Sequence, residues 1–119
     1  MKVTYPAPKT VSVWVGTFRT EDDFDRCVDD SVSTKLKLDT EFESICEIAF
    51  QPEPVSLRSL LDGFSGFETF CQRAVLAASS RGIETANCAL VCYHLDCCEA
   101  PDDWDGLRFL GSFPGQDIV

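Results

Sequence analysis

Alternation of apolar and polar residues predicts three β-strands in this chain. In residues 10–18, three valines share one side of an extended backbone, while Trp14 and Phe18 fall on the other side. A period of two predicts a strand, and apolar residues on both sides indicate that both faces of the sheet are covered. Residues 87–95 are apolar at both parities, which predicts a central strand buried on both faces. Residues 107–113 alternate again and predict a third strand, which ends at a Pro-Gly pair.

The spacing of apolar residues changes to that of a helix after Thr20. The Thr20 hydroxyl is a good N-cap, and the next three residues are acidic, which suits the positive end of a helix dipole. The predicted buried stripe is Phe24, Cys27 and Val28. The opposite, solvent-facing side carries Asp22, Asp29 and Asp30. We therefore expect a short helix with an acidic outer face.

Two more helices are predicted in the middle of the chain. Ser56 begins a short helix with three leucines turned inward, and Gly63 ends it. Ser65 and Glu68 have the spacing of a capping box and begin the longest predicted helix, which Gly82 ends. The apolar stripe of that helix is Phe67, Phe70, Cys71, Ala74, Ala77 and Ala78. We expect this stripe to pack in the main core against the predicted central strand.

The pattern is ambiguous over residues 31–50. Thr40 and Glu43 have the spacing of a capping box, and the apolar residues around them keep helical spacing. A strand is the alternative, because every second residue is apolar at Cys46, Ile48 and Phe50. Between the two, the sequence favours a helix, and Pro52 and Pro54 then predict an extended break.

The order of these elements predicts a single α+β domain. We expect the helices to pack on a small, mainly antiparallel sheet, because only about a dozen residues separate the last two strands. At 119 residues, the chain has the length of one domain. Residues 1–9 hold no apolar stretch and are expected to form a loose N-terminal segment.

The charge balance narrows the range of partners. Twenty Asp and Glu residues against ten Lys and Arg residues give a net charge of −10. Phosphate backbones and anionic membranes repel such a chain, so we expect it to bind neither nucleic acid nor membrane, whereas a basic protein is attracted. No stretch after Met1 resembles a signal peptide, and no apolar run is long enough to cross a bilayer, which predicts a cytoplasmic protein.

Seven cysteines and one histidine raise the question of a metal or thiol site. In a reducing compartment, we expect most of these cysteines to be small buried hydrophobic residues rather than disulfides. Cys88 and Cys92 have the spacing of a zinc pair, but on an extended strand they would lie about 13 Å apart, too far to share one ion. Only His94, Cys97 and Cys98 can converge near the end of the strand. We expect no metal and no cofactor; the alternative is a small metal-binding or thiol-dependent enzyme that uses these three residues.

Other signatures of catalysis are missing from the sequence. The glycines are scattered at the ends of predicted elements and do not form a phosphate-binding loop. The carboxylates lie in runs on a solvated helix face and a loop, not opposite one another on buried strands. The sequence therefore predicts a binding protein and not an enzyme.

The strongest candidate for a binding surface is the acidic loop before the last predicted strand. Its residues are Asp102, Asp103, Trp104 and Asp105. An aromatic anchor within a ring of like charge is the composition expected where a basic partner binds. The alternatives are that Trp104 packs in the core and pins the loop, and that the acidic residues serve solubility alone. We expect the acidic helix face at Asp22, Asp29 and Asp30 to support the loop.

Four motifs, taken in order, resemble one protein family. They are VSVWVGTF at residues 11–18, EDDF at residues 21–24, LLDGFSGFETF at residues 60–70 and LRFLGSFP at residues 107–114. In this order and spacing they resemble the immunity protein 22 family of bacterial polymorphic toxin systems. The resemblance implies a cytoplasmic protein without catalytic residues, which binds and neutralises the toxin encoded beside it.

A nuclease is one toxin that suits this charge, since an acidic protein can fill a basic cleft made for phosphate. An acidic adaptor with another partner is a further alternative.

Overall fold

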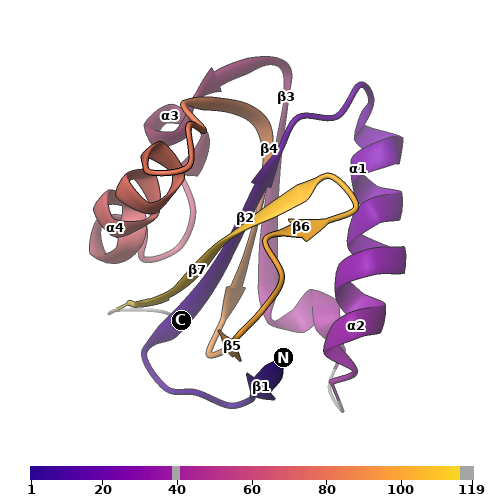
Figure 1. The fold of residues 1–119 in the computed structure, drawn as a ribbon, viewed down its shortest axis with the longest axis vertical. Helices are drawn as coiled ribbons and strands as arrows, with labels where there is room; N and C mark the ends of the chain where they lie inside the picture. The colour runs from indigo at the N-terminus through magenta and orange to yellow at the C-terminus, as the bar shows by residue number, and fades with distance from the viewer. Residues whose placement is uncertain (39–40, 116–119) are drawn as a thin grey trace.

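Five antiparallel strands form the central sheet of the molecule (Figure 1). The computed structural model describes residues 1–38 and 41–115. The strands are β1 (Lys2–Thr4), β2 (Thr10–Gly16), β3 (Cys46–Ser56), β4 (Thr85–Tyr93), β5 (Asp96–Cys98), β6 (Asp103–Trp104) and β7 (Leu107–Pro114). The helical segments are α1 (Glu21–Cys27), η1 (Val28–Ser33), α2 (Thr34–Leu36), η2 (Phe42–Ser44), α3 (Leu57–Leu61) and α4 (Phe67–Ser79). The strand order in the central sheet is β3-β4-β2-β7-β6, and β1 pairs with β5 in a separate two-stranded sheet.

Strands β2 and β4 are both interior strands; the sequence predicts this position for β4 and two covered faces for β2. They run antiparallel, with Val13 opposite Val91 and Trp14 opposite Leu90. Every residue of β4 after Thr85 is buried, as expected for a strand with apolar residues at both parities. The third predicted strand is also confirmed, because β7 pairs with the other edge of β2.

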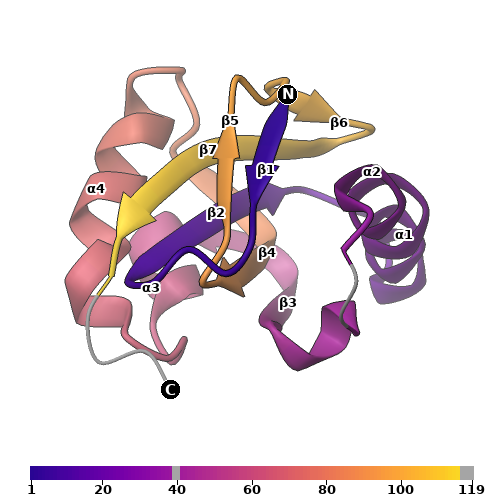
Figure 2. The same ribbon diagram turned by 90° about the horizontal axis from the view of Figure 1, so that it is seen from below.

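Helices cover both faces of this sheet and make two separate cores. Figure 2 shows α3 and α4 on one side of the sheet and α1 and α2 on the other. The first core combines the valines of β2 with α3 and α4, and it includes Phe70 and Ala74, both fully buried as predicted. The second core gathers Trp14 and Trp104 against α1. The fold is therefore α+β, and the two sides of β2 face different layers.

Helix α1 begins where the sequence predicts. The Thr20 hydroxyl accepts a hydrogen bond from the Asp23 amide at 3.1 Å. The helix then continues further than predicted, through the π-helical turn η1 and the short α2, and ends at Lys37 in a left-handed conformation. The buried stripe of the whole helix is Phe24, Cys27, Val28, Val32 and Leu36. This stripe keeps one side of the helix on the second core beyond the predicted end.

The helix predicted after residue 40 is wrong. Apart from the 3₁₀ turn η2, the chain there forms strand β3, and the predicted cap Thr40 lies outside the described residues. This stretch also has an alternating pattern of apolar residues, and that pattern agrees with the observed strand. The strand forms because β4 pairs with every residue from Cys46 to Phe50. Pairing with a neighbouring strand outweighs a weak helical spacing.

Strand β3 lies at the edge of the sheet, and this position accommodates its two prolines. The break predicted at Pro52 and Pro54 is an irregularity of the ladder, where the register with β4 shifts between Phe50 and Val55. Proline has no N–H to donate, so it is tolerated on edge strands and at bulges.

The two helices on the first face begin in different ways. Ser56 caps α3 as predicted, because its hydroxyl accepts the Ser59 amide at 3.2 Å. The capping box predicted for α4 is wrong: Gly66 precedes the helix in a left-handed conformation with φ of 69°, and no side chain caps it. Ser65 instead donates from its amide and hydroxyl to the Glu47 carboxylate of β3, at 2.8 and 2.9 Å. Ser65 therefore ties the start of α4 to the sheet edge.

The N-terminal residues 1–9 are more ordered than the loose segment that the sequence predicts. Strand β1 pairs antiparallel with β5, with Val3 opposite Cys97. Val3 packs partly buried against the second core. A strand with a single inward apolar side chain is too short for periodicity to reveal it.

Candidate partner-binding surface

The acidic loop predicted to bind a partner is a tight hairpin between β6 and β7. Trp104 pairs with Leu107, so only Asp105 and Gly106 lie between the strands. Both of these residues have positive φ, 57° and 110°. Positive φ at both central residues is the requirement of a type I′ turn, for which Asp-Gly is a favoured sequence.

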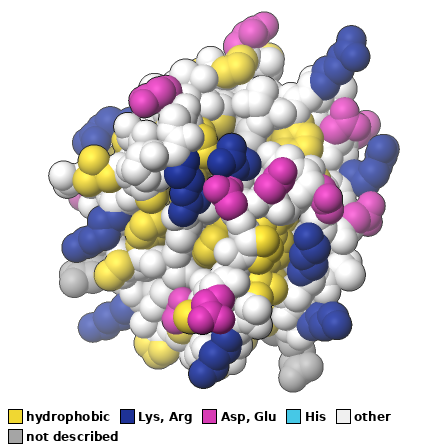
Figure 3. Space-filling view, in the orientation of Figure 1, with side chains coloured by type: hydrophobic (Ala, Val, Ile, Leu, Met, Phe, Trp, Pro, Cys, Tyr) yellow, Lys and Arg dark blue, Asp and Glu magenta, His cyan; other side chains and the backbone are white. Residues whose placement is uncertain are grey.

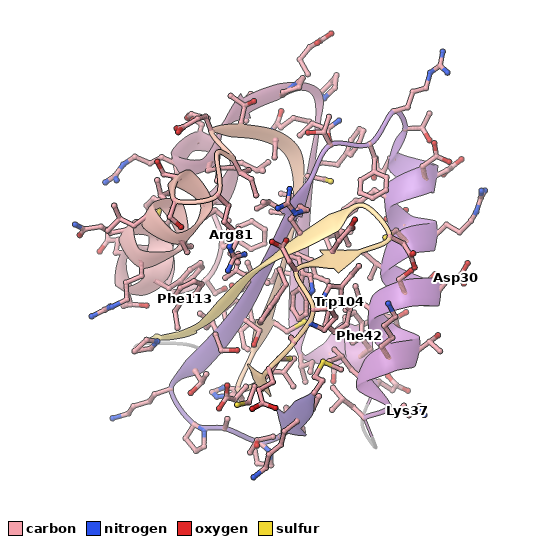
Figure 4. All side chains as sticks on the ribbon, viewed as in Figure 1. Asp30, Lys37, Phe42, Arg81, Trp104 and Phe113 are labelled. Carbon is pink, nitrogen blue, oxygen red and sulfur yellow. The ribbon has the colours of Figure 1, made fainter. Side chains whose placement is uncertain are left out.

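The hairpin turns Trp104 into the core, so the prediction that Trp104 is an exposed anchor for a partner is wrong. Its side chain is fully buried, and its ring lies edge-on to Trp14 at 5.4 Å between centroids. The indole N–H donates to the Pro101 carbonyl at 2.6 Å, and the Lys35 ammonium lies 5.4 Å above the ring. Figure 4 shows Trp104 between the hairpin and the α1–α2 helix. Trp104 therefore pins the loop.

The three acidic residues of the loop are exposed, but each is engaged within the protein. Arg108 donates two hydrogen bonds to the Asp102 carboxylate, at 2.6 and 3.1 Å, and this lowers the pKa of Asp102. Asp103 accepts the amide of the turn glycine at 2.8 Å. Asp105 accepts the Ser31 hydroxyl at 2.5 Å. The face that carries the hairpin also displays Lys and Arg among its acidic side chains (Figure 3), so this face carries both positive and negative charge.

The acidic helix face is exposed as predicted, but its members have different surroundings. Asp22, Asp29 and Asp30 are all open to solvent. Asp30 points away from the sheet (Figure 4). Asp29 lines a groove on the β3 side of the helix. The groove is therefore the place where the predicted helix face meets another element.

This groove lies between the α1–η1 helix, the η2 turn and the edge strand β3, and its volume is about 310 Å³. We call it the acidic groove; its lining residues are Asp25, Val28, Asp29, Phe42, Glu43, Cys46 and Ile48. The carboxylates of Asp25, Asp29 and Glu43 are exposed. Asp25 and Asp29 lie four residues apart and so project from the same side of the helix. The groove thus brings together acids from two separate segments of the chain.

Apolar side chains lie among these acids. Ile48 is 49% exposed, and Phe42, which is partly buried, also lines the groove. Val28 is almost fully buried beneath. An apolar centre with a charged surround is the arrangement found where proteins bind one another.

Two further grooves flank β3. One, of about 440 Å³, also contains Ile48 and reaches Asp62 after α3. The other, of about 530 Å³, shares Cys46 with the acidic groove and is bordered by Glu47 and His94. Among the described residues that line these three grooves, none is Lys or Arg. Among these described lining residues the Asp and Glu side chains are therefore not mixed with Lys or Arg, in contrast to the hairpin.

The residues of the alternative metal or thiol site are not brought together. His94 follows β4 in a left-handed conformation and is half-buried. Cys97 is buried, and burial raises its pKa to about 11, which makes it a poor nucleophile. Cys98, the next residue of β5, is exposed. Within residues 1–38 and 41–115, no three His, Cys, Asp or Glu side chains are grouped to hold a metal ion.

Most cysteines have the structural role that the sequence predicts. Five of the seven are buried. Burial raises the pKa of Cys88 to about 12, although its thiol also donates to the Gly16 carbonyl at 3.2 Å. Such thiols act as small core side chains.

The sequence interpretation missed four residues of the acidic groove: Asp25, Phe42, Glu43 and Ile48. Their signal is present but indirect. Pro52 and Pro54 within an alternating stretch indicate an edge strand, and an isoleucine on such a strand has one side open to solvent. If the residues after residue 40 are assigned to a strand instead of a helix, the two prolines identify it as an edge strand.

No protein-family model matches this chain, and no curated protein or solved structure matches it significantly. No helix within the described part of the chain is both long enough and apolar enough to span a membrane. The acidic groove is therefore interpreted from its own chemistry.

Proposed function

We propose that this protein is a non-enzymatic, cytoplasmic immunity protein that binds a basic bacterial toxin and neutralises it. The acidic groove is the observation that carries this proposal, because it places three carboxylates around an exposed Ile48 with no basic side chain among its described lining residues. A basic partner would set Lys or Arg against Asp25, Asp29 and Glu43 and an apolar side chain on Ile48. The resemblance of the four sequence motifs to the immunity protein 22 family supports the same function.

To neutralise a toxin, such a protein has only to occupy the toxin's functional site and does not have to catalyse a reaction. A toxin that acts on nucleic acid has a basic cleft, and a row of carboxylates can take the place of phosphates there. The net charge of −10 would also draw a basic partner toward the protein at long range. The groove then supplies the short-range contact.

The test uses the protein encoded beside this one in its genome. It is expressed in a bacterial host with and without this chain, and growth is measured. We expect the neighbouring protein to arrest growth and this chain to restore it. The purified pair should bind in isothermal titration calorimetry. A neighbour that is harmless, or one that this chain neither binds nor neutralises, would contradict the proposed function.

A pair of matched variants tests the site separately. The groove variant is Asp25→Asn, Asp29→Asn and Glu43→Gln. The control variant removes three exposed acids elsewhere: Glu53→Gln, Glu68→Gln and Glu99→Gln. Since removing one partner of a buried charge pair at an interface costs about 2–5 kcal/mol, we expect the groove variant to lose at least about tenfold in affinity and the control to lose less. Equal losses in the two variants would place the contact elsewhere while leaving the function intact.

A further inference from the structure

Two cysteines face each other across the ladder that holds the edge strand to the sheet. Cys46 of β3 is the register partner of Cys92 of β4. The Tyr93 amide donates to the Ile45 carbonyl at 2.8 Å, so the directly opposed pair Ile45–Tyr93 is hydrogen-bonded and the next pair, Cys46–Cys92, is not. In such a pair the Cα atoms lie about 4.5 Å apart with both side chains on one face, within the range that a disulfide spans.

The two thiols have different environments. Cys92 is fully buried, and burial raises its pKa well above the usual value. Cys46 is partly exposed and lines two grooves, so a small molecule in solution can reach it. A hydrogen bond from the Cys92 thiol lowers the pKa of Cys46, and this effect outweighs burial and the nearby Glu43 and Glu47. The open cysteine is thus the better nucleophile, and the shielded one lies directly behind it.

We propose that Cys46 and Cys92 form a redox-modification site, in which Cys46 reacts with a small peroxide and Cys92 then closes a reversible disulfide. The strand register carries this inference, because it sets the two side chains opposite each other on one face of the sheet. It does not depend on the proposed function.

The chemistry balances with hydrogen peroxide as the oxidant. The Cys46 thiolate attacks one peroxide oxygen, the O–O bond breaks, and the departing hydroxide takes up a proton to become water. The Cys92 thiol, which the strand register holds opposite Cys46, then attacks the sulfenic sulfur as its proton passes to the departing hydroxyl, so an S–S bond forms and the S–O bond breaks. The Cys92 proton leaves with the hydroxyl as a second water. Two thiols have lost two electrons, and the peroxide has gained them.

The bond formed here should be readily reduced. Opposed residues in an antiparallel pair have Cβ atoms about 4.5–5.5 Å apart, whereas a relaxed disulfide brings them to about 3.8 Å. Closing the bond therefore draws β3 toward β4 and stores strain, and strained disulfides are the labile ones. The disulfide would fasten the edge strand beside the acidic groove.

The experiment uses the full chain with Cys98→Ser, which removes the exposed thiol and prevents links between molecules. After treatment with hydrogen peroxide, the protein is digested without reductant and analysed by mass spectrometry. We expect a peptide pair that joins Cys46 to Cys92, and dithiothreitol should separate it. Adding Cys46→Ser should abolish the link, and Cys92→Ala should leave a Cys46 sulfenic acid that dimedone traps. Cys71→Ala is the matched control and should keep the link.

Two results would overturn the proposal. One is that Cys46 and Cys92 both stay reduced at a peroxide dose that oxidises Cys98 in the wild-type chain. The other is a link from Cys92 to Cys97, a further buried cysteine near Cys92. Where Cys92→Ala does not fold, mapping of the link in the Cys98→Ser protein decides between these outcomes by itself.

Discussion

At the scale of the residue, Phe70 shows how much of the fold one side chain stabilises. Its ring is fully buried in the first core, which also contains the valines of β2. The sheet beneath it is fixed by antiparallel ladders on both sides of β2. The cavity left by a smaller side chain cannot therefore close easily, and its cost remains in the folded state.

We expect Phe70→Ala to lower the free energy of unfolding by about 3–5 kcal/mol. Urea denaturation followed by circular dichroism measures this change. Leu76 lies on the same helix and is 62% exposed, so Leu76→Ala is the control and should change stability by no more than about 0.5 kcal/mol. If the two variants unfold alike, the helix register described for α4 is not the one in solution.

At the scale of the element, one carboxylate joins the edge strand to the longest helix. Glu47 of β3 accepts the Ser65 amide at 2.8 Å, the Ser65 hydroxyl at 2.9 Å and the Tyr93 hydroxyl at 2.5 Å. Burial works against the ionised form of Glu47, but the hydrogen bonds outweigh it and lower its pKa. A lowered pKa means that this stabilisation is present above the ordinary pKa of a glutamate and is lost as the pH falls through the lower, folded-state value.

A double-mutant cycle tests this connection. Ser65→Ala and Glu47→Ala should be coupled by about 0.5–1.5 kcal/mol in unfolding free energy at about pH 7, because each change removes the hydrogen bond from the Ser65 hydroxyl to the Glu47 carboxylate. The coupling should shrink as the solution is acidified, since protonation of Glu47 removes the charged acceptor. The control cycle pairs Ser65→Ala with Glu68→Ala, which should be additive. Coupling in the Glu68 cycle and none in the Glu47 cycle would show that Ser65 and Glu68 form the capping box that the sequence predicts.

The elements that the sequence predicts well are those that a local pattern defines. Both interior strands and the buried stripe of α4 follow from the period of their apolar residues alone. Strand β3 cannot be predicted in this way, because its residues from Cys46 to Phe50 fit both the helical and the strand period. The strand forms because these residues pair with β4, about forty residues further along the chain. The acidic groove is hard to predict for the same reason, because four of its seven lining residues belong to η2 and β3.

The burial of Trp104 could have been predicted from the sequence. Asp105-Gly106 is a favoured two-residue hairpin turn, which places the residues on either side of it opposite each other on one face of the sheet. Leu107 is apolar and begins a predicted strand, so Trp104 should share its buried side. A row of aspartates around a tryptophan resembles an exposed binding site only when the turn between the strands is overlooked.

At the scale of the whole molecule, net charge and local contact have separate effects on binding. The net charge of −10 acts over the distance between approaching proteins and is screened by salt, with a Debye length of about 8 Å at physiological ionic strength. The groove acts only after contact, through the carboxylates and Ile48. Long-range attraction changes the association rate, whereas desolvated contacts govern dissociation.

The groove variant and the control variant separate these effects, because each removes three negative charges from the same total. Against the immobilised protein encoded beside this one, both variants should associate more slowly than wild type at low salt, by similar factors, and the difference should fade at high salt. The groove variant alone should dissociate faster, by about tenfold or more, since only it removes acids that touch the partner. Surface plasmon resonance over a range of salt concentrations measures both rates. A control variant that dissociates as fast as the groove variant would show that the partner binds another face, and an association rate insensitive to salt would remove charge attraction from the mechanism.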